Sequence, residues 1–205
     1  MSTPKHREKS EATRAKLKGW GFDSEITERM GAFFVLWALF ETNLETTIWA
    51  LTNENVSGQR PSTDMTPVSK WIEILGHGTD RFSPEIRDSL KMGARAAQDL
   101  LEYRNSIAHG WAIPMETGPM FLRNPSWNGE IRKRPVGDAH LNNDLLDMAI
   151  DCAWVLSSLI FATREASHDL SKEASIRDLR LDVNRAARQA SELRHLTALM
   201  KHEKN

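Results

Sequence analysis

Apolar residues recur every three or four positions over most of this chain, the spacing of amphipathic α-helices. The first such segment begins at Ser24, which we take as its N-cap, and it ends near Asn53. Its middle, from Phe33 to Phe40, is apolar on every side, and this predicts a helix that is buried on most sides.

Two further helices are marked by their start and stop residues. A short one should have Pro67 at its first position, reach Leu75 and end in Gly76-His77-Gly78, which places His77 in a loop. The next begins at Ser83-Pro84-Glu85, where an N-cap serine, a first-position proline and an early acid stand in the expected order. Gly110 fits the C′ position that ends this helix.

The pattern changes between residues 111 and 139, where prolines and glycines exclude a long helix. Residues 111–115 and 120–123 could pair there as a small β-hairpin. Helical spacing then returns in residues 141–166, and a last helix is expected over residues 171–201. Its seam is heptad-like and rich in alanine, which suits close packing on its own domain, on a second copy or on another protein.

These elements predict an all-α protein, a bundle of four or five helices with an irregular or hairpin insertion before the fourth long helix. We expect a polar N-terminal arm over residues 1–21, either mobile or helical and with a basic excess. The helical domain should span residues 22–168, including the insertion at 111–139, and a charged C-terminal helix should cover residues 169–205.

Composition supports a globular chain and excludes several classes of protein. Hydrophobic residues make up 40% of the 205 positions, and a net charge of -1 gives no general affinity for polyanions. The single cysteine, Cys152, excludes an internal disulfide and a cysteine metal cluster. The run from Met30 to Phe40 is too short for a bilayer, which needs about 20 residues. We therefore expect a soluble, cytoplasmic protein with no membrane partner.

The segment with the clearest chemistry is Arg104-Asn105-Ser106-Ile107-Ala108-His109-Gly110, at the end of the predicted 84–109 helix. A guanidinium matches phosphate oxygens, and an imidazole exchanges protons near neutral pH. The same two side chains could instead satisfy the free carbonyls and the dipole of the helix end. Two other pairs, Arg134–His140 in a loop and Arg188–His195 on a polar helix, have similar spacing but lack such a setting.

The segment from Tyr103 to Gly110 resembles the signature of the HEPN superfamily (higher eukaryotes and prokaryotes nucleotide-binding domains), and the helical order over about residues 22–168 is similar. In that family an arginine, usually a polar residue, three to five further residues and a histidine lie near the end of a bundle helix. The resemblance implies a metal-independent endoribonuclease without a cofactor, which acts as a homodimer with two motifs facing across a two-fold interface. Bacterial defence or stress response would be a fitting setting.

Carried over to this chain, the resemblance gives Arg104 the task of holding the scissile phosphate and His109 that of general acid and base. Asn105 would position these groups or the RNA, and the product would be a 2′,3′-cyclic phosphate. Toxin branches of the family often have a tyrosine two residues after the histidine. This chain has Trp111 there, which argues against that kind of toxin.

Other side chains are weaker candidates. Glu41 and Asn43, in the first helix, and Tyr103 could support the motif, although for Glu41 and Asn43 a satisfied buried polar pair is the favoured explanation. A second group could grip the RNA backbone and stack a base, or could form only a solvated basic loop: Arg123, Trp127, Arg132, Lys133 and Arg134. No His, Asp or Glu grouping has convincing metal-ligand spacing in the sequence.

Three functional hypotheses remain open at this level. The first is the dimeric endoribonuclease, with RNA as its partner and room for a regulatory protein partner. The second is a non-catalytic module of the same fold that binds a nucleotide, a nucleic acid or a protein. The third is a purely structural helical dimer, in which Arg104 and His109 would be bonded to their own helix end and turned away from any cleft.

Overall fold

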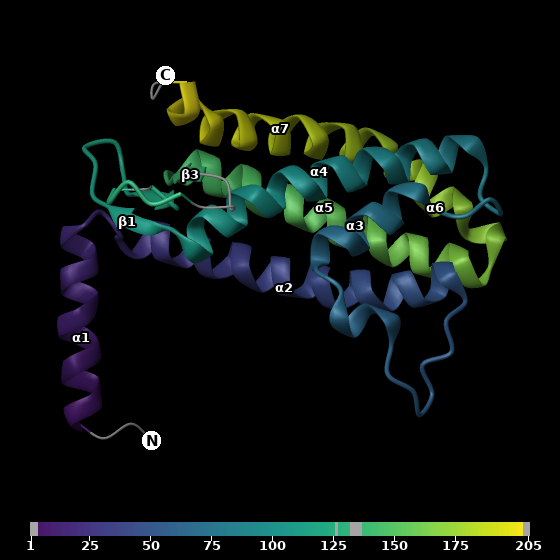
Figure 1. The fold of residues 1–205 in the computed structure, drawn as a ribbon, viewed down its shortest axis with the longest axis horizontal. Coiled ribbons are helices and arrows are strands. Elements are labelled where there is room, and N and C mark those ends of the chain that lie inside the picture. The colour runs from purple at the N-terminus through teal and green to yellow at the C-terminus, as the bar shows by residue number, and fades with distance from the viewer. Residues whose placement is uncertain (1–3, 126, 132–136, 203–205) are drawn as a thin grey trace.

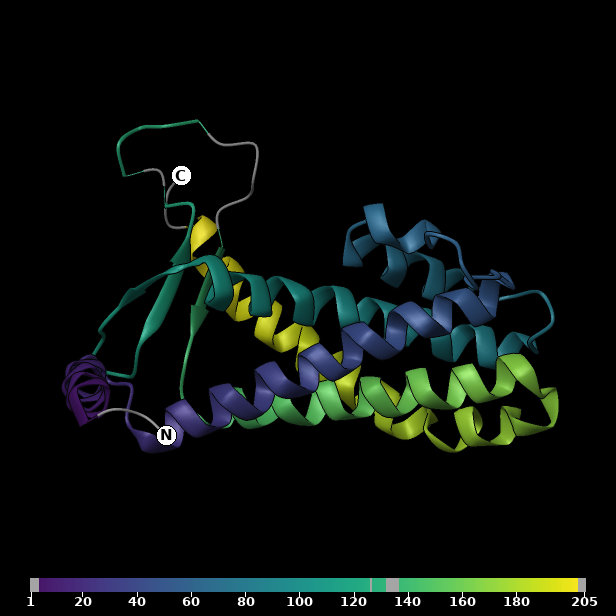
Figure 2. The same ribbon diagram turned by 90° about the horizontal axis from the view of Figure 1, so that it is seen from below.

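The computed structural model describes residues 4–125, 127–131 and 137–202, and most of them are helical. Four long helices run along the long axis of the molecule: α2 (Ser24–Thr52), α4 (Pro84–His109), α5 (Asn143–His168) and α7 (Arg180–His202) (Figures 1 and 2). The shorter elements are α1 (Pro4–Gly19), α3 (Val68–His77), α6 (Glu173–Asp178) and two 3-10 turns, Ser62–Met65 and Leu170–Lys172. The expected all-α class with a small β insertion is confirmed.

One hydrophobic core joins the long helices. From α2 it takes large aromatic side chains, Phe33, Trp37 and Phe40, which are fully buried. The other helices add aliphatic and small residues, namely Ile86, Leu90, Ala97 and Leu100 from α4, Leu146, Leu156, Leu159 and Ile160 from α5, and Val183, Ala186, Ala190 and Leu193 from α7. The small residues on α4 and α7 let these two helices approach each other closely.

Helix ends lie close to their predicted positions, with three corrections. The N-cap of α2 is Asp23 instead of Ser24, because the Asp23 carboxylate accepts a hydrogen bond from the Ile26 backbone N–H at 2.9 Å. Pro67 is the N-cap of α3, so the helix begins one residue later than expected. His77 is the last residue of α3 and not a loop residue.

A three-stranded antiparallel sheet lies at the C-terminal end of α4 (Figure 1). Strands β1 (Trp111–Ile113) and β2 (Met120–Arg123) form the predicted hairpin, with Trp111 opposite Leu122. The sequence did not predict β3 (Gly137–His140), which pairs with β2. The hydroxyl of Tyr103 on α4 donates to the His140 carbonyl at 2.9 Å and ties this strand to the motif helix.

Gly110 is needed for a reason other than the predicted one. Its φ of -88° and ψ of 163° are extended, so it is not the left-handed C′ residue of a helix. A Cβ at this position would collide with the Ser106 carbonyl oxygen and lie 2.9 Å from the Cβ of Phe121 on β2. The chain therefore passes from α4 into the sheet through a gap too narrow for any side chain.

The C-terminal helix is shorter than expected. Residues 171–201 form a 3-10 turn, then α6, then α7, because the helix breaks around Leu179. The alanine-rich seam of α7 is buried against α4 and α5 of the same chain. Of the three partners that the sequence left open, the seam therefore packs on its own domain. The N-terminal arm is the helix α1, which projects from the end of the bundle with exposed side chains from Lys5 onward (Figure 1).

Among the described residues, α5 is the helix that is long and apolar enough to cross a membrane. Half of its most apolar window is buried inside the bundle. Core helices of bundles pass the same test of length and composition, so the observation is weak evidence for a membrane span.

Candidate functional site

Arg104 lies between α4 and α2 with its guanidinium held from two sides. Its Nη1 donates to the side-chain oxygen of Asn105 at 3.0 Å, and its Nη2 lies 3.8 Å from Oε1 of Glu41. The Nε atom is buried and has no hydrogen-bond partner in the described parts of the chain. A buried donor that lacks a partner costs free energy. The Arg104 side chain as a whole is 24% exposed, so its accessible part can still bind an acceptor such as a phosphate oxygen.

Glu41 is itself fixed in place by the core. The indole N–H of Trp37, one turn earlier on α2, donates to Glu41 Oε1 at 2.5 Å, and the Trp37 ring is almost fully buried. A rigid aromatic side chain thus orients a carboxylate, which in turn orients the guanidinium. Glu41 on α2 contacts Arg104 on α4 directly, and this contact supports its proposed role in positioning Arg104.

His109 occupies the last turn of α4, as the sequence predicts, and is exposed. Five residues of α-helix correspond to a rotation of about 140° beyond one full turn. Arg104 therefore faces the bundle side of α4 while His109 faces solvent, and a single chain does not turn both toward one point. The contacts of Arg104 with Asn105 and Glu41 differ from the part of the structural hypothesis in which Arg104 bonds its own helix end.

Two exposed tryptophans lie beside the motif. Trp111 follows His109 by two residues, and its ring contacts that of Trp127 edge to face, with centroids 5.7 Å apart. Sequence reasoning singled out Trp127 as a base-stacking candidate and treated Trp111 only as a departure from the family. The signal for Trp111 was its position directly after the helix end, where a large aromatic residue remains in solvent. Exposed aromatic faces of this kind stack nucleic-acid bases.

The remaining predicted site residues lie elsewhere or are engaged in structure. Asn43 donates to the Leu39 carbonyl of its own helix at 2.8 Å and lines a groove between α2, α5 and α6, so it does not support the motif. Tyr103 is buried, and this burial raises the pKa of its hydroxyl far above the usual value.

Arg123 pairs with Glu102 at 2.6 Å, which makes it a structural cation. Arg132, Lys133 and Arg134 lie outside the described residues.

The outer face of α2 differs from the prediction of a helix buried on most sides. Val35 is 69% exposed, and Leu39 is also exposed, one turn further along the same face. On the neighbouring helix α5, Trp154 and Phe161 are exposed and line a groove of about 970 Å³ together with Leu39. We call Val35, Leu39, Trp154 and Phe161 the α2–α5 apolar face. Exposed apolar patches that are contiguous mark interaction surfaces more often than solvated ones.

No group of three or more His, Cys, Asp or Glu side chains within the described ranges is placed to hold a metal ion. Arg188 and His195, one of the two other Arg–His pairs with a spacing similar to that of the motif, are exposed on α7, as the sequence suggested. Comparison of the chain with protein-family models, curated proteins and solved structures gives no match.

Proposed function

We propose that this protein is a cytoplasmic, metal-independent endoribonuclease that acts as a homodimer. The observation that carries the proposal is the state of Arg104, whose guanidinium is oriented by Asn105 and Glu41 while its side chain stays 24% exposed. A phosphodiester oxygen would bind the exposed part of this oriented cation. RNA is the substrate class because its own 2′-hydroxyl can act as the nucleophile.

In the proposed reaction the 2′-oxygen forms a bond to the adjacent phosphorus while the bond to the 5′-oxygen breaks. The products are a 2′,3′-cyclic phosphate and a 5′-hydroxyl end. A base takes the proton of the 2′-hydroxyl, and an acid donates a proton to the leaving 5′-oxygen. Arg104 would stabilise the charge that develops on the phosphoryl oxygens, since a fixed cation does so with little reorganisation.

Two proton transfers need two groups, and each chain offers one histidine in the motif. A second copy would supply the second His109 and a second Arg104, which also overcomes their divergence around α4. The α2–α5 apolar face favours such an assembly because it would otherwise remain in water. Val35 precedes Glu41 by six residues, about 9 Å along the helix axis. The same six residues turn the side chain by about 240° around α2, so Val35 and Glu41 project from different sides of the helix.

The alternative of a non-catalytic binding module has one specific observation in its favour. The carboxylate of Glu41 lies 3.8 Å from Arg104 and offsets part of its positive charge. An arginine neutralised in this way could hold a partner's polar group without promoting a reaction. The two proposals differ in whether RNA is cut.

The test is cleavage of a mixed-sequence RNA in the presence of EDTA, with the product ends identified by mass spectrometry. We expect wild type to produce 2′,3′-cyclic phosphates, and Arg104→Ala and His109→Ala each to lose at least about a hundredfold in rate, the usual contribution of such groups. The decoy variants Arg188→Ala and His195→Ala are matched controls and should cut normally. Binding without cleavage by wild type would favour the module, and motif variants that cut normally would refute the catalytic assignment.

A further inference from the structure

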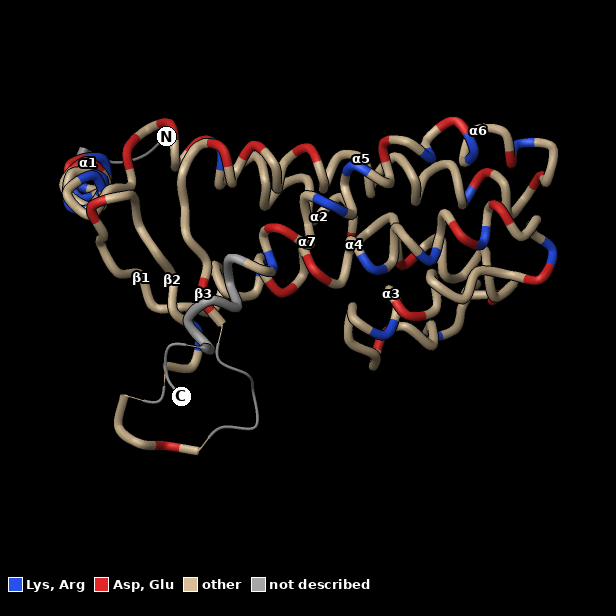
Figure 3. The backbone as a smooth tube through the Cα atoms, turned by 90° about the horizontal axis from the view of Figure 1, so that it is seen from above, with Lys and Arg blue, Asp and Glu red and all other residues tan. Residues whose placement is uncertain are grey.

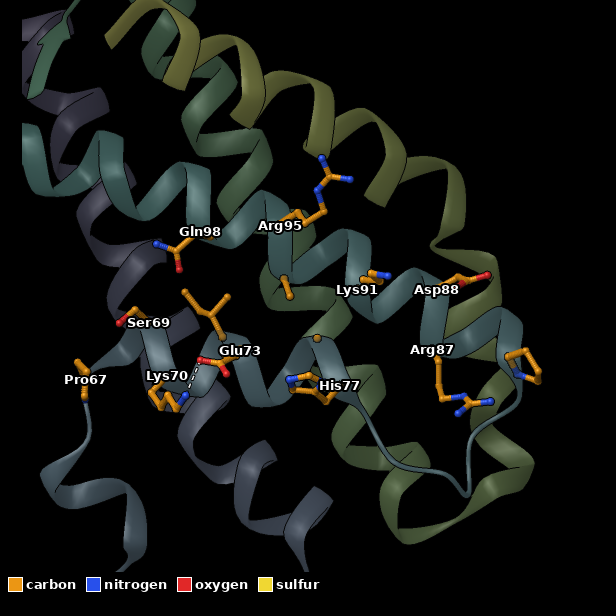
Figure 4. Close-up of a pocket in the computed structure, with 14 residues that line it drawn as sticks. Pro67, Ser69, Lys70, Glu73, His77, Arg87, Asp88, Lys91, Arg95 and Gln98 are labelled. Atoms are coloured by element: carbon orange, nitrogen blue, oxygen red, sulfur yellow. Dashed lines mark hydrogen bonds and ion pairs between the residues drawn. The ribbon is translucent and has the colours of Figure 1, made fainter. Parts of the chain in front are cut away.

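A groove of about 820 Å³ runs between α3 and α4, away from Arg104 (Figure 4). Its floor is apolar and closely packed, because Gly76 on α3 faces Ala94 on α4 with no room for a larger side chain: a Cβ on Gly76 would lie 3.0 Å from that of Ala94. Basic side chains stand along its edges, namely Lys70 and His77 from α3 and Arg87, Lys91 and Arg95 from α4.

The cations of this groove differ in how far they are already neutralised. Lys70 is bonded to Glu73 at 2.6 Å, and Arg87 lies 3.3 Å from Asp80. Lys91 and Arg95 are exposed and have no ion-pair partner among the residues that the structure describes. Asp88, three residues before Lys91 on the same helix, also lines the groove. The available positive charge therefore lies on α4, at Lys91 and Arg95.

The same face of α4 leads from these cations to the motif. Lys91 and His109 are eighteen residues apart, which is five complete turns, so they project in the same direction about 27 Å apart along the axis. Arg95, Gln98 and Asn105 are four, seven and fourteen residues after Lys91, so they project within about 40° of the same direction. Figure 3 shows the course of α4 along the bundle. We call Lys91, Arg95, Gln98, Asn105 and His109 the α4 track.

Acidic residues near the α4 track are neutralised by partners from other elements. Glu102 lies between Gln98 and Asn105 and is bonded to Arg123 of β2 at 2.6 Å. Asp99 is bonded to Arg194 of α7, also at 2.6 Å. A polyanion that followed this face would thus meet two free cations and then amide side chains. Neither of the carboxylates near the motif end of the track would repel it as an unpaired charge.

We propose that the α4 track binds the phosphate backbone of single-stranded RNA and guides it to His109. This inference rests on the proposed nuclease function for its direction, but not for the binding itself. Cations spaced along a helix suit repeated phosphates, whereas a mononucleotide site would need them to converge. The exposed pair Trp111 and Trp127 at the motif end favours a single strand, whose unpaired bases can stack on aromatic rings.

The experiment measures binding of a fluorescent oligouridine of about 20 nucleotides, long enough to span the track. All proteins carry His109→Ala, so that the RNA survives. The test variant adds Lys91→Gln and Arg95→Gln. The matched control adds Lys9→Gln and Lys16→Gln, which removes the same charge from α1, a separate helix that is not part of the α4 track. Each dissociation constant is determined over a series of salt concentrations.

We expect the track variant to bind at least about tenfold more weakly at low salt. Its slope of log affinity against log salt should fall by about 1.4, since each phosphate contact to a single strand contributes about 0.7. The α1 control should keep both values. An unchanged track variant, an equal loss in the α1 control, absence of RNA binding by the parent protein, or displacement of the RNA by micromolar adenosine nucleotide would each overturn the inference.

Failure of the RNA-binding proposal can be distinguished from failure of the nuclease proposal. If RNA binds through the α4 track but is never cut by the protein with His109 intact, the nuclease proposal is refuted and the RNA-binding proposal is not. Conversely, a track variant with His109 intact that cuts long RNA with an unchanged KM would refute the track and leave the nuclease standing. If both are correct, KM for long RNA rises in the track variant, while cleavage of a dinucleotide is unaffected.

Discussion

The guanidinium of Arg104 and the carboxylate of Glu41 lie 3.8 Å apart between α4 and α2, and their side chains are 24% and 25% exposed. The residues are 63 positions apart in the sequence, so only the packing of α2 near α4 brings them together. Trp37 fixes the carboxylate from the core side. Through this contact the rigidly packed helix α2 fixes the position of Arg104, the residue proposed to hold the phosphate.

Replacing Glu41 by glutamine should separate positioning from charge. The amide keeps an acceptor for Trp37 but loses the charge that aligns Arg104, so we expect kcat to fall about tenfold, or about 1.4 kcal/mol. KM should not rise, because the removed carboxylate also repelled phosphate. Steady-state cleavage of a defined RNA gives both values. Glu45→Gln is the control, because Glu45 accepts from Thr63 at 2.7 Å and does not contact the motif. A higher kcat in Glu41→Gln would show that Glu41 restrains the site.

The α2–α5 apolar face gives a prediction about assembly. Val35→Glu places a charge on this face and should convert the proposed dimer to a monomer, with loss of cleavage and no loss of helix content. Leu181→Glu, at a position on α7 that is 81% exposed, introduces the same charge outside the face and should leave the dimer intact. Light scattering and circular dichroism check both. A wild type that is monomeric at assay concentrations and still cuts RNA would contradict the proposed dimer.

Sequence periodicity predicted the helices, but it could not assign their faces. Phe33 and Phe40 are buried while Val35 and Leu39 are exposed, although all four belong to one apolar run. In such a run the hydrophobic pattern carries no direction, so only tertiary packing distinguishes core from interface. For α7 the sequence pattern did predict which face is buried. It did not identify the partner of that face, because a seam of small residues packs equally well against several helices.

The motif itself was visible from its residues, since Arg104, Asn105 and His109 are local in sequence. Glu41 was selected because a charged residue interrupts an apolar segment. Asn43 met the same criterion and was wrong as a support for the motif, because it lies further around α2 and bonds its own backbone. Strand β3 was not predicted, because four residues are too few to show an alternation of apolar and polar positions. Its pairing with β2 is set by contacts that are distant in the sequence.

Arg123 should matter for stability more than for RNA binding. Its side chain is 12% exposed and is bonded to Glu102, which is 36% exposed. Arg123→Ala would leave this carboxylate without its partner, and we expect a loss of about 2 kcal/mol in the free energy of unfolding. Arg185→Ala breaks an exposed contact with Asp151 and should cost much less than the loss in Arg123→Ala. Urea denaturation measures both losses. An unaltered stability together with weaker RNA binding would restore Arg123 as an RNA contact.

Tyr103 makes stability depend on pH in the alkaline range. Burial raises the pKa of its hydroxyl in the folded protein, whereas in the unfolded chain the group ionises near pH 10. The unfolded state therefore loses this proton first. The free energy of unfolding should be unaffected by the group below about pH 10 and should decrease above it by about 1.4 kcal/mol per pH unit. Burial raises the pKa of the Cys152 thiol too, which adds a similar loss from about pH 8.5 upward.

The effect can be assigned because Tyr103 is the only tyrosine of the sequence. Tyrosinate absorbance should appear only as the helical circular dichroism is lost, at one common pH. Tyr103→Phe keeps the packing against Phe33 but removes the bond to the His140 carbonyl, so it should cost about 1 kcal/mol at neutral pH. Above pH 10 its stability should decline less steeply than that of wild type, leaving the Cys152 contribution. Tyrosinate that forms near pH 10 in a fully helical protein would show that the hydroxyl at the base of the motif helix is open to solvent.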